Sequence, residues 1–270
     1  MSIGRDVYCD TRLMIQKLEE LYPQGTLSER SPEGKGIQGL LETWTNDQFF
    51  WHVARLLPPT YPMIDKAWRE DRADMAGDKL SAEAPDEARR EALGHIVAAL
   101  DMLEHTFFAD GRDWILKTKN PTLADINGIW TWDWLFHDSW MEGAIPDEYA
   151  LDVRFPKVFA WTERFRQLLR ETEAPVTWMD SNDVVEAILS SEFAEPEGTV
   201  DPTDPLGLQK GQEIEVWPTD SGMNHHDHGF LVKLDIREVA ISAKSKDGRE
   251  LRIHFPRTNF RISAISELAN

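Results

Sequence analysis

Residues 120–126 read NPTLADI, and this stretch marks the start of the most aromatic helix that the sequence predicts. The Thr122 hydroxyl can accept a hydrogen bond from the backbone N–H three residues on, and the Asp125 carboxylate can accept one from the N–H of Thr122. This is the reciprocal arrangement of a capping box, with Asp in place of the more common Glu or Gln. The stretch therefore fixes a helix start near residue 123.

Helical periodicity extends to both sides of this cap. Apolar side chains recur at spacings of three and four in five segments, which are residues 10–21, 37–57, 85–110, 155–173 and 182–193. The connections are short and contain Pro or Gly. We therefore predict an all-helical bundle that continues to about residue 195.

The pattern changes after a proline-rich acidic linker at residues 196–205. Beyond the linker, apolar and polar residues alternate in five short segments, and Phe230, Val232 and Leu234 share one face of the second. An Asp-Gly pair at residues 247–248 is a hairpin turn signal. We predict a small five-stranded β-barrel, because closure of the sheet protects its edges.

The composition disfavours several kinds of partner and site. The chain of 270 residues is 41% hydrophobic and carries a net charge of −19, which disfavours nucleic acid or an anionic membrane as the main partner. Its one cysteine, Cys9, excludes an internal disulfide framework and a thiolate zinc cluster. No apolar run has the length of a membrane span, and the N-terminus lacks a signal sequence. We expect a soluble, cytoplasmic protein.

Two segments together resemble the glutathione S-transferase family. Residues 7–14 resemble the last strand and third helix of its thioredoxin-like domain, and residues 121–126 resemble the cap of the central helix in its all-helical domain. The resemblance implies a mainly α fold and a homodimer. It divides the chain into a thioredoxin-like remnant (1–30), a helical domain (31–195), the linker (196–205) and a β-barrel module (206–270).

The resemblance also implies a glutathione site at Asp10 and Thr11. The N-terminus of a helix attracts an anion, so it can hold the α-carboxylate of the γ-glutamyl group. The Thr11 hydroxyl can add a hydrogen bond, and Asp10 can balance the α-ammonium. The alternative is that Asp10 is only a helix cap. The family's thiol-activating residue has no counterpart here, so the catalytic residue stays unassigned, and Cys9 is interpreted as a structural residue.

Similar proteins of fungal secondary metabolism combine this helical half with an extra β-module. That layout implies a glutathione-dependent enzyme that performs thiol addition, or addition and elimination with trans-to-cis isomerisation, on an apolar polyketide-type substrate. Indole rings of Trp44, Trp130 and Trp134 can line the apolar pocket, or they can be core side chains. The competing hypothesis is a non-catalytic dimeric scaffold with a β-barrel docking module.

A histidine run lies in the β-region. His225, His226 and His228 carry nitrogen donors that suit Zn, Co or Ni, but adjacent residues of one strand converge poorly. A further ligand, for example His254, would have to come from elsewhere in the chain. Three interpretations stay open: a polar loop that binds no ion, adventitious metal binding, and a functional metal site.

Overall fold

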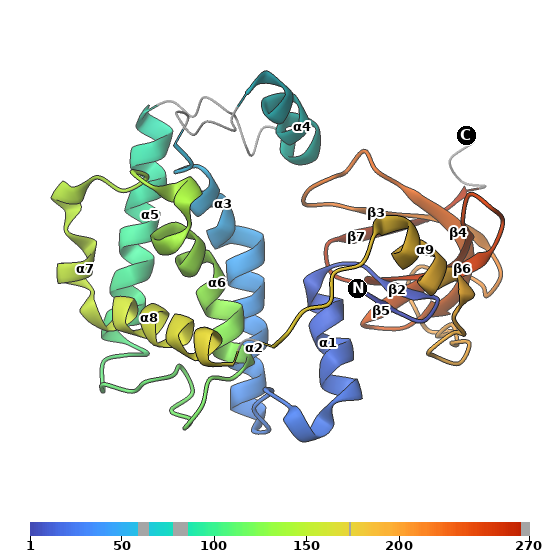
Figure 1. Ribbon diagram of the computed structural model, residues 1–270, viewed down its shortest axis with the longest axis horizontal. Helices are drawn as coiled ribbons and strands as arrows, with labels where there is room; N and C mark the ends of the chain where they lie inside the picture. The colour runs from blue at the N-terminus through green and yellow to red at the C-terminus, as the bar shows by residue number, and fades with distance from the viewer. Residues whose placement is uncertain (59–64, 78–85, 173, 266–270) are drawn as a thin grey trace. The chain divides into compact units, whose positions relative to one another are not determined.

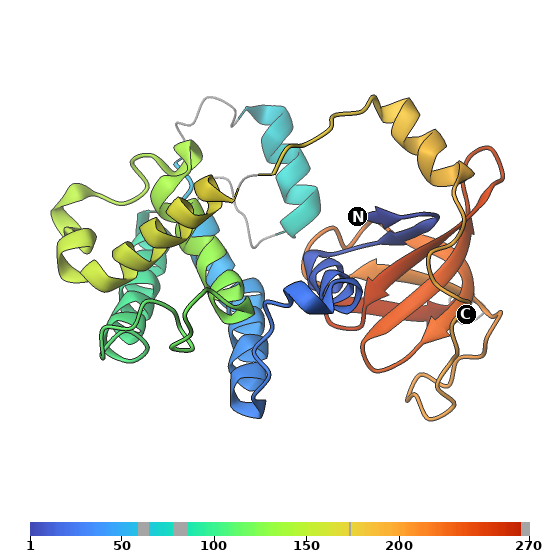
Figure 2. The ribbon, with the colours of Figure 1, turned by 60° about the horizontal axis from the view of Figure 1, so that its bottom comes forward.

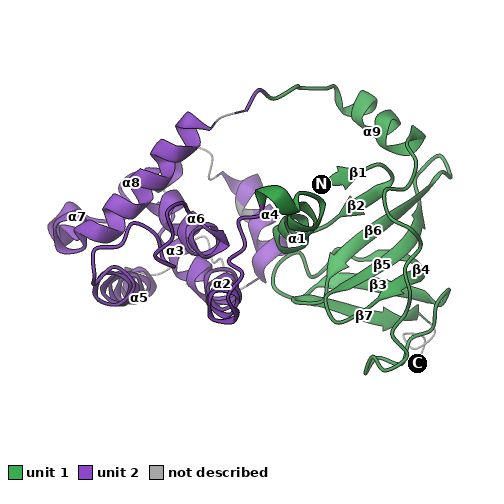
Figure 3. Ribbon diagram, turned by 90° about the horizontal axis from the view of Figure 1, so that it is seen from below, with its two compact units in different colours: residues 1–25, 176–270 green, residues 26–175 purple. Residues whose placement is uncertain are grey.

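The computed structural model describes residues 1–58, 65–77, 86–172 and 174–265. The chain forms two compact units: unit 1 contains residues 1–25 and 176–270, and unit 2 contains residues 26–175 (Figures 1 and 3). Each unit has a hydrophobic core of its own. Within the described residues, none of the helices combines the length and the apolar character that a membrane crossing requires.

Unit 2 is helical, as the periodicity predicts. Its elements are α2 (Pro32–Trp44), a π-helix (Thr45–Phe49), α3 (Phe50–Ala54), α4 (Lys66–Ala76), α5 (Asp86–His105), α6 (Leu123–His137), 3₁₀ turns at Ser139–Met141 and Asp147–Tyr149, α7 (Leu151–Arg154) and α8 (Pro156–Glu171). The largest fully buried side chains of its core are Trp132 on α6 and Trp161 on α8.

The predicted capping box at the start of α6 is confirmed. Asp125 Oδ2 accepts the backbone N–H of Thr122 at 2.9 Å, and the Thr122 hydroxyl caps the helix. Asp125 is fully buried, and its Oδ1 also accepts the N–H of Ile115 at 2.9 Å and the indole N–H of Trp161 at 3.1 Å. One carboxylate therefore ties α6 to α8 and to the loop that precedes α6.

Unit 1 is built on one sheet of seven strands (Figure 2). The strands are β1 (Ser2–Ile3), β2 (Asp6–Tyr8), β3 (Glu213–Pro218), β4 (Asp227–Leu234), β5 (Glu238–Lys244), β6 (Glu250–Pro256) and β7 (Phe260–Ala264), in the order β1-β2-β6-β5-β4-β3-β7. Helices α1 (Thr11–Leu21) and α9 (Ser181–Ser190) and a 3₁₀ turn (Pro23–Gly25) complete the unit.

The expectation of a closed five-stranded barrel is wrong. All five predicted strands form, but β1 and β2 from the N-terminus extend the sheet beyond β6. Strand β2 pairs with β6 in parallel, whereas the other pairs are antiparallel, so the sheet is mixed. The edge that closure would have protected is covered instead by strands from the other end of the chain.

The compact units also differ from the predicted division of the chain. Residues 1–25 do not form a separate remnant but join the C-terminal strands, and α9 belongs to the same unit rather than to the helical one. A two-stranded ribbon with one helix cannot bury its own apolar surface, so it needs a larger sheet to pack against. Strand β6 supplies that sheet.

A β-bulge changes the predicted faces of β4. The pairing of β4 with β5 shifts register between Leu231 and Lys233. As a result Leu231 and Leu234 enter the core, while Phe230, expected on the inner face, is 52% exposed. An inserted residue reverses the alternation on one side of a bulge, and the sequence does not mark its position.

Candidate functional site

The start of α1 holds a strained residue. Asp10 is the N-cap, and its carboxylate accepts the N–H of Arg12 at 2.8 Å. Its backbone has φ 66° and ψ 138°, a conformation that side-chain-bearing residues rarely adopt. Strain of this kind costs on the order of 1–3 kcal/mol and concentrates at ligand-binding sites. Thr11, the first helical residue, is exposed, so its hydroxyl is accessible beside the strained cap.

The side chains that precede this turn are held in their neutral forms. Cys9 is half-buried against the core of unit 1, and its backbone N–H donates to the His254 carbonyl at 2.8 Å. Burial, with the neighbouring Asp10 carboxylate, raises the pKa of the Cys9 thiol. Burial and a 2.7 Å hydrogen bond to Glu195 raise the pKa of Tyr8 far above its ordinary value. Neither group offers a reactive anion near neutral pH.

The three predicted pocket indoles belong to aromatic stacks of unit 2. The Trp44 ring lies 4.8 Å from that of Phe49, measured between centroids. The Phe50 ring lies 5.5 Å from Trp130 and 5.8 Å from Trp134. Trp130 is 36% exposed, and Trp44 and Trp134 are half-buried. Trp44 and Trp134 therefore pack against the core of unit 2, and Trp130 with Phe50 forms a partly exposed aromatic surface.

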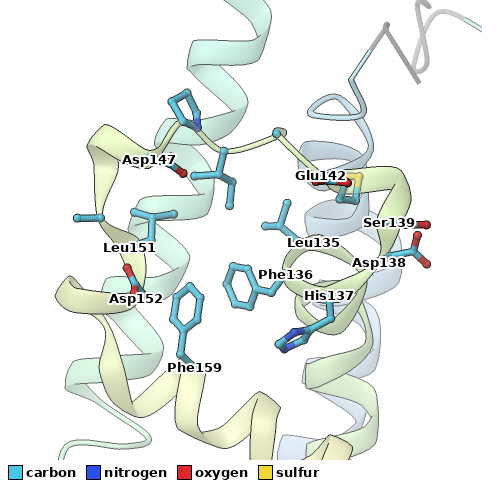
Figure 4. Close-up of a pocket in the computed structure, with 15 residues that line it drawn as sticks. Leu135, Phe136, His137, Asp138, Ser139, Glu142, Asp147, Leu151, Asp152 and Phe159 are labelled. Atoms are coloured by element: carbon cyan, nitrogen blue, oxygen red, sulfur yellow. The ribbon is translucent and has the colours of Figure 1, made fainter. Parts of the chain in front are cut away.

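A cavity of about 860 Å³ opens elsewhere in unit 2, beside the end of α6, α7 and the first half of α8 (Figure 4). Leu135, Met141 and Leu151 are buried in its wall, and the rings of Phe136 and Phe159 stack at 4.1 Å. None of the three predicted indoles is among its lining residues. This cavity is therefore not the pocket that we expected Trp44, Trp130 and Trp134 to line.

The rim of this cavity is acidic. Four of its lining residues are carboxylates, Asp138, Glu142, Asp147 and Asp152, and none of the described lining residues is Lys or Arg. Burial lowers the pKa of His137, whose Nε2 lies 3.4 Å from the Thr162 hydroxyl, so its imidazole is neutral near pH 7. A cavity with this acidic rim repels an anion such as glutathione.

Two of the three histidines in the run contact one carboxylate, and His225 lies in the turn before them. His226 Nδ1 lies 2.7 Å from Glu215 Oε1, and His228 Nε2 lies 3.4 Å from the same oxygen. The backbone N–H of His225 donates to the Gly222 carbonyl in the preceding turn. Strand β3 thus supplies the carboxylate Glu215, where we expected another histidine such as His254.

His254 belongs to a separate buried network. Its Nε2 lies 2.9 Å from Asp6 Oδ1 and its Nδ1 lies 2.6 Å from Glu238 Oε1. Burial lowers the pKa of His254, but the two carboxylates outweigh this and leave the pKa above its ordinary value. Lys17 Nζ lies 2.7 Å from Glu195 and 3.1 Å from Glu238.

Glu195, Glu238 and His254 have the spacing of a metal site. In this structure, however, ammonium groups and imidazole protons already occupy their donor atoms. The network therefore joins β2 and α1 to the C-terminal strands as a set of buried ion pairs.

Comparisons with known proteins support the fold. A family model described as "Domain of unknown function (DUF7962)" matches residues 52–174. No curated protein matches the chain. Among solved structures, a GST-like protein from Pseudomonas syringae is similar, with a TM-score of 0.66 and 19% sequence identity over 97% of this chain and 80% of that one. The chain has a GST-like fold.

Sequence reasoning missed Glu215 and the cavity. Glu215 alternates with the core residues Ile214 and Val216, which signals that it faces away from the core, but its cross-strand partner depends on the register. The cavity depends on how three helices meet, which no local pattern records.

Proposed function

We propose that the protein is a glutathione-dependent enzyme of the transferase type that acts on an apolar electrophile. The observation that carries this proposal is the start of α1, where a strained cap, Asp10, stands beside an exposed hydroxyl, Thr11, in a chain with a GST-like fold. Local strain persists only where the surrounding structure enforces it, and ligand sites are where it is commonly found.

Glutathione binds in this proposal through its γ-glutamyl end. The α-carboxylate lies at the N-terminus of α1, where the helix dipole and backbone N–H groups favour negative charge, and accepts a hydrogen bond from the Thr11 hydroxyl. The Asp10 carboxylate pairs with the α-ammonium group. The site thus recognises both charges of the amino-acid end and leaves the cysteinyl thiol free to react.

The reaction is addition to a conjugated double bond, followed where the substrate allows by elimination. The thiolate forms a carbon–sulfur bond, and the electrons of the double bond move into the conjugated acceptor. Rotation about the new single bond and cleavage of the carbon–sulfur bond then return the thiolate and the isomerised olefin. Because Cys9 and Tyr8 stay neutral, the chain's part in this scheme is to bind and orient the two substrates.

Calorimetry tests the glutathione site directly. We expect Thr11→Val to weaken glutathione binding by at least about tenfold, since one hydrogen bond to a charged group contributes about 1.5–3 kcal/mol. Thr106→Val is the matched control, because Thr106 is also an exposed threonine but lies in unit 2, where no contact with glutathione is proposed. Equal affinity in wild type and Thr11→Val, or no binding of glutathione at all, would refute the proposal.

The electrophile has two candidate positions in unit 2. Trp44, Trp130 and Trp134 are the contacts proposed from the sequence, and the cavity beside Phe159 is the alternative apolar site. The conjugation of glutathione to 1-chloro-2,4-dinitrobenzene distinguishes the two positions. A raised KM for the dinitrobenzene in Trp130→Ala would place the electrophile at the aromatic surface. A raised KM for it in Phe159→Ala would place the electrophile in the cavity.

A non-catalytic dimeric scaffold is the second candidate. The neutral state of Cys9 and Tyr8 favours it, since neither can activate a thiol. Glutathione binding without conjugation of any model electrophile, together with a homodimer by light scattering, would support the scaffold over the enzyme.

A further inference from the structure

We propose that the cavity beside α6, α7 and α8 is a binding site for an organic cation with an aromatic body, such as an arylalkylammonium ion (Figure 4). All of its described lining residues belong to unit 2 and lie between Leu135 and Phe159. Its volume of about 860 Å³ is within the range of cavities that hold small organic molecules. The proposal goes beyond the proposed function, because it depends neither on glutathione nor on the start of α1.

Two stacked aromatic rings supply the apolar part of the site. Phe136 comes from α6 and Phe159 from α8, and their centroids lie 4.1 Å apart. Both side chains line the cavity and are only partly buried, so part of each ring is open to a ligand. The face of a phenyl ring attracts both another aromatic group and a cation. The aromatic body of the ligand therefore packs against these two rings.

Four exposed carboxylates carry the negative charge of the site. They flank the two rings on both sides, as Figure 4 shows, and are Asp138, Glu142, Asp147 and Asp152. The basic side chains of α8 are directed at other carboxylates. Lys157 Nζ lies 3.9 Å from Glu104, and Arg166 Nη1 lies 3.0 Å from Asp133. Within the described part of the chain, none of the four rim carboxylates makes an ion pair, so a bound cation would be their counter-charge.

The end of α6 adds to the negative potential. The last residues of this helix, 135–137, line the cavity, and the C-terminal end of a helix carries a partial negative charge. Among the described lining residues, His137 alone can become positively charged. Burial and the nearby Arg166 lower the pKa of His137, so its imidazole is neutral near pH 7. The carboxylates and the helix end therefore favour a cation over an anion of the same shape.

Calorimetry on the full chain with three ligands that share one body tests the site. The ligands are 3,3-diphenylpropylammonium, the neutral 3,3-diphenyl-1-propanol and the anion 3,3-diphenylpropanoate. We expect the ammonium ion to bind at least about tenfold more tightly than the alcohol, and the alcohol more tightly than the anion. Equal affinities for the ammonium ion and the alcohol, or no binding of the ammonium ion, would overturn the proposal.

Variants at the exposed rim show whether the carboxylates contact the cation. The double variant Asp147→Asn/Asp152→Asn should weaken binding of the ammonium ion by about three- to tenfold and leave binding of the alcohol unchanged. Glu148→Gln is the matched control, because Glu148 is an exposed carboxylate of the same 3₁₀ turn as Asp147 but does not line the cavity. A loss in Glu148→Gln as large as in the double variant would show only a general attraction to an acidic chain and contradict the site.

A third variant tests the aromatic part. Phe159→Ala should lower the affinity for the ammonium ion and for the alcohol alike, because the body that packs against the ring is the same in both. Trp130→Ala, at the aromatic surface that Trp130 forms with Phe50, should change neither affinity. A loss in Trp130→Ala without a loss in Phe159→Ala would place the ligand on that surface and overturn the proposal.

Discussion

At the scale of single residues, Asp125 joins three segments of unit 2 through one carboxylate. It is fully buried, and burial raises its pKa despite the hydrogen bonds from Ile115, Thr122 and Trp161. The capping half of this arrangement is local and was predictable from four consecutive residues. The links to Ile115 and Trp161 join distant segments, so they depend on the packing of the helices.

Substitution of Asp125 should therefore cost more than the loss of an ordinary cap. We expect Asp125→Ala to lower the free energy of unfolding of unit 2 by about 2–4 kcal/mol, because it leaves buried N–H donors without an acceptor. Chemical denaturation measures this. Asp125→Asn keeps one oxygen acceptor, so it should lower the free energy of unfolding by less. The exposed Asp101→Ala should change that free energy little. A loss in Asp125→Ala no larger than in Asp101→Ala would contradict the assigned role.

At the scale of elements, the sequence predicts strand β2 correctly but does not predict the strand with which it pairs. The strand and the helix after it lie where the family resemblance places them, but β2 pairs with β6, 246 residues later in the chain. The pairing brings Asp6 against His254, and α1 brings Lys17 against Glu238. The C-terminal β-module is thus completed by the N-terminus.

This pairing should weaken as the pH rises above 6.5. The folded-state pKa of His254 lies above the ordinary 6.5, so the stabilisation from its protonated form is complete below pH 6.5 and is lost as the pH rises through the folded pKa. We expect the free energy of unfolding of unit 1 to fall in that interval by at most about 1.4 kcal/mol per pH unit. His254→Gln should flatten the profile, and the exposed His105→Gln should not. An unchanged slope in His254→Gln would exclude this origin.

At the scale of the whole molecule, the two units have separate cores. One core gathers the side chains of the helices, and the other gathers the inner face of the sheet. Of the eleven tryptophans, only Trp178 and Trp217 lie in unit 1, so intrinsic fluorescence reports mainly on unit 2. The acidic excess of the chain lies before residue 206, which leaves the β-module nearly neutral.

Separate cores predict separate unfolding. We expect two transitions in scanning calorimetry, one for each unit. Asp125→Asn should lower the midpoint temperature of the unit 2 transition alone, which tryptophan fluorescence also follows. His254→Gln should lower the midpoint temperature of the unit 1 transition alone. A single transition that both variants shift equally would show that the units unfold together.

The sequence by itself determined α2, α5, α6 and α8 of unit 2, the cap of α6 and the five C-terminal strands, because hydrophobic periodicity and capping are local in the chain, whereas α4 and α7 were not predicted. Only the tertiary structure decided that β1 and β2 complete the sheet, that a bulge exposes Phe230, and that Glu215 meets His226 and His228. Register and strand order are set by contacts between residues far apart in the chain. A local pattern of apolar residues does not identify the strand against which those side chains will pack.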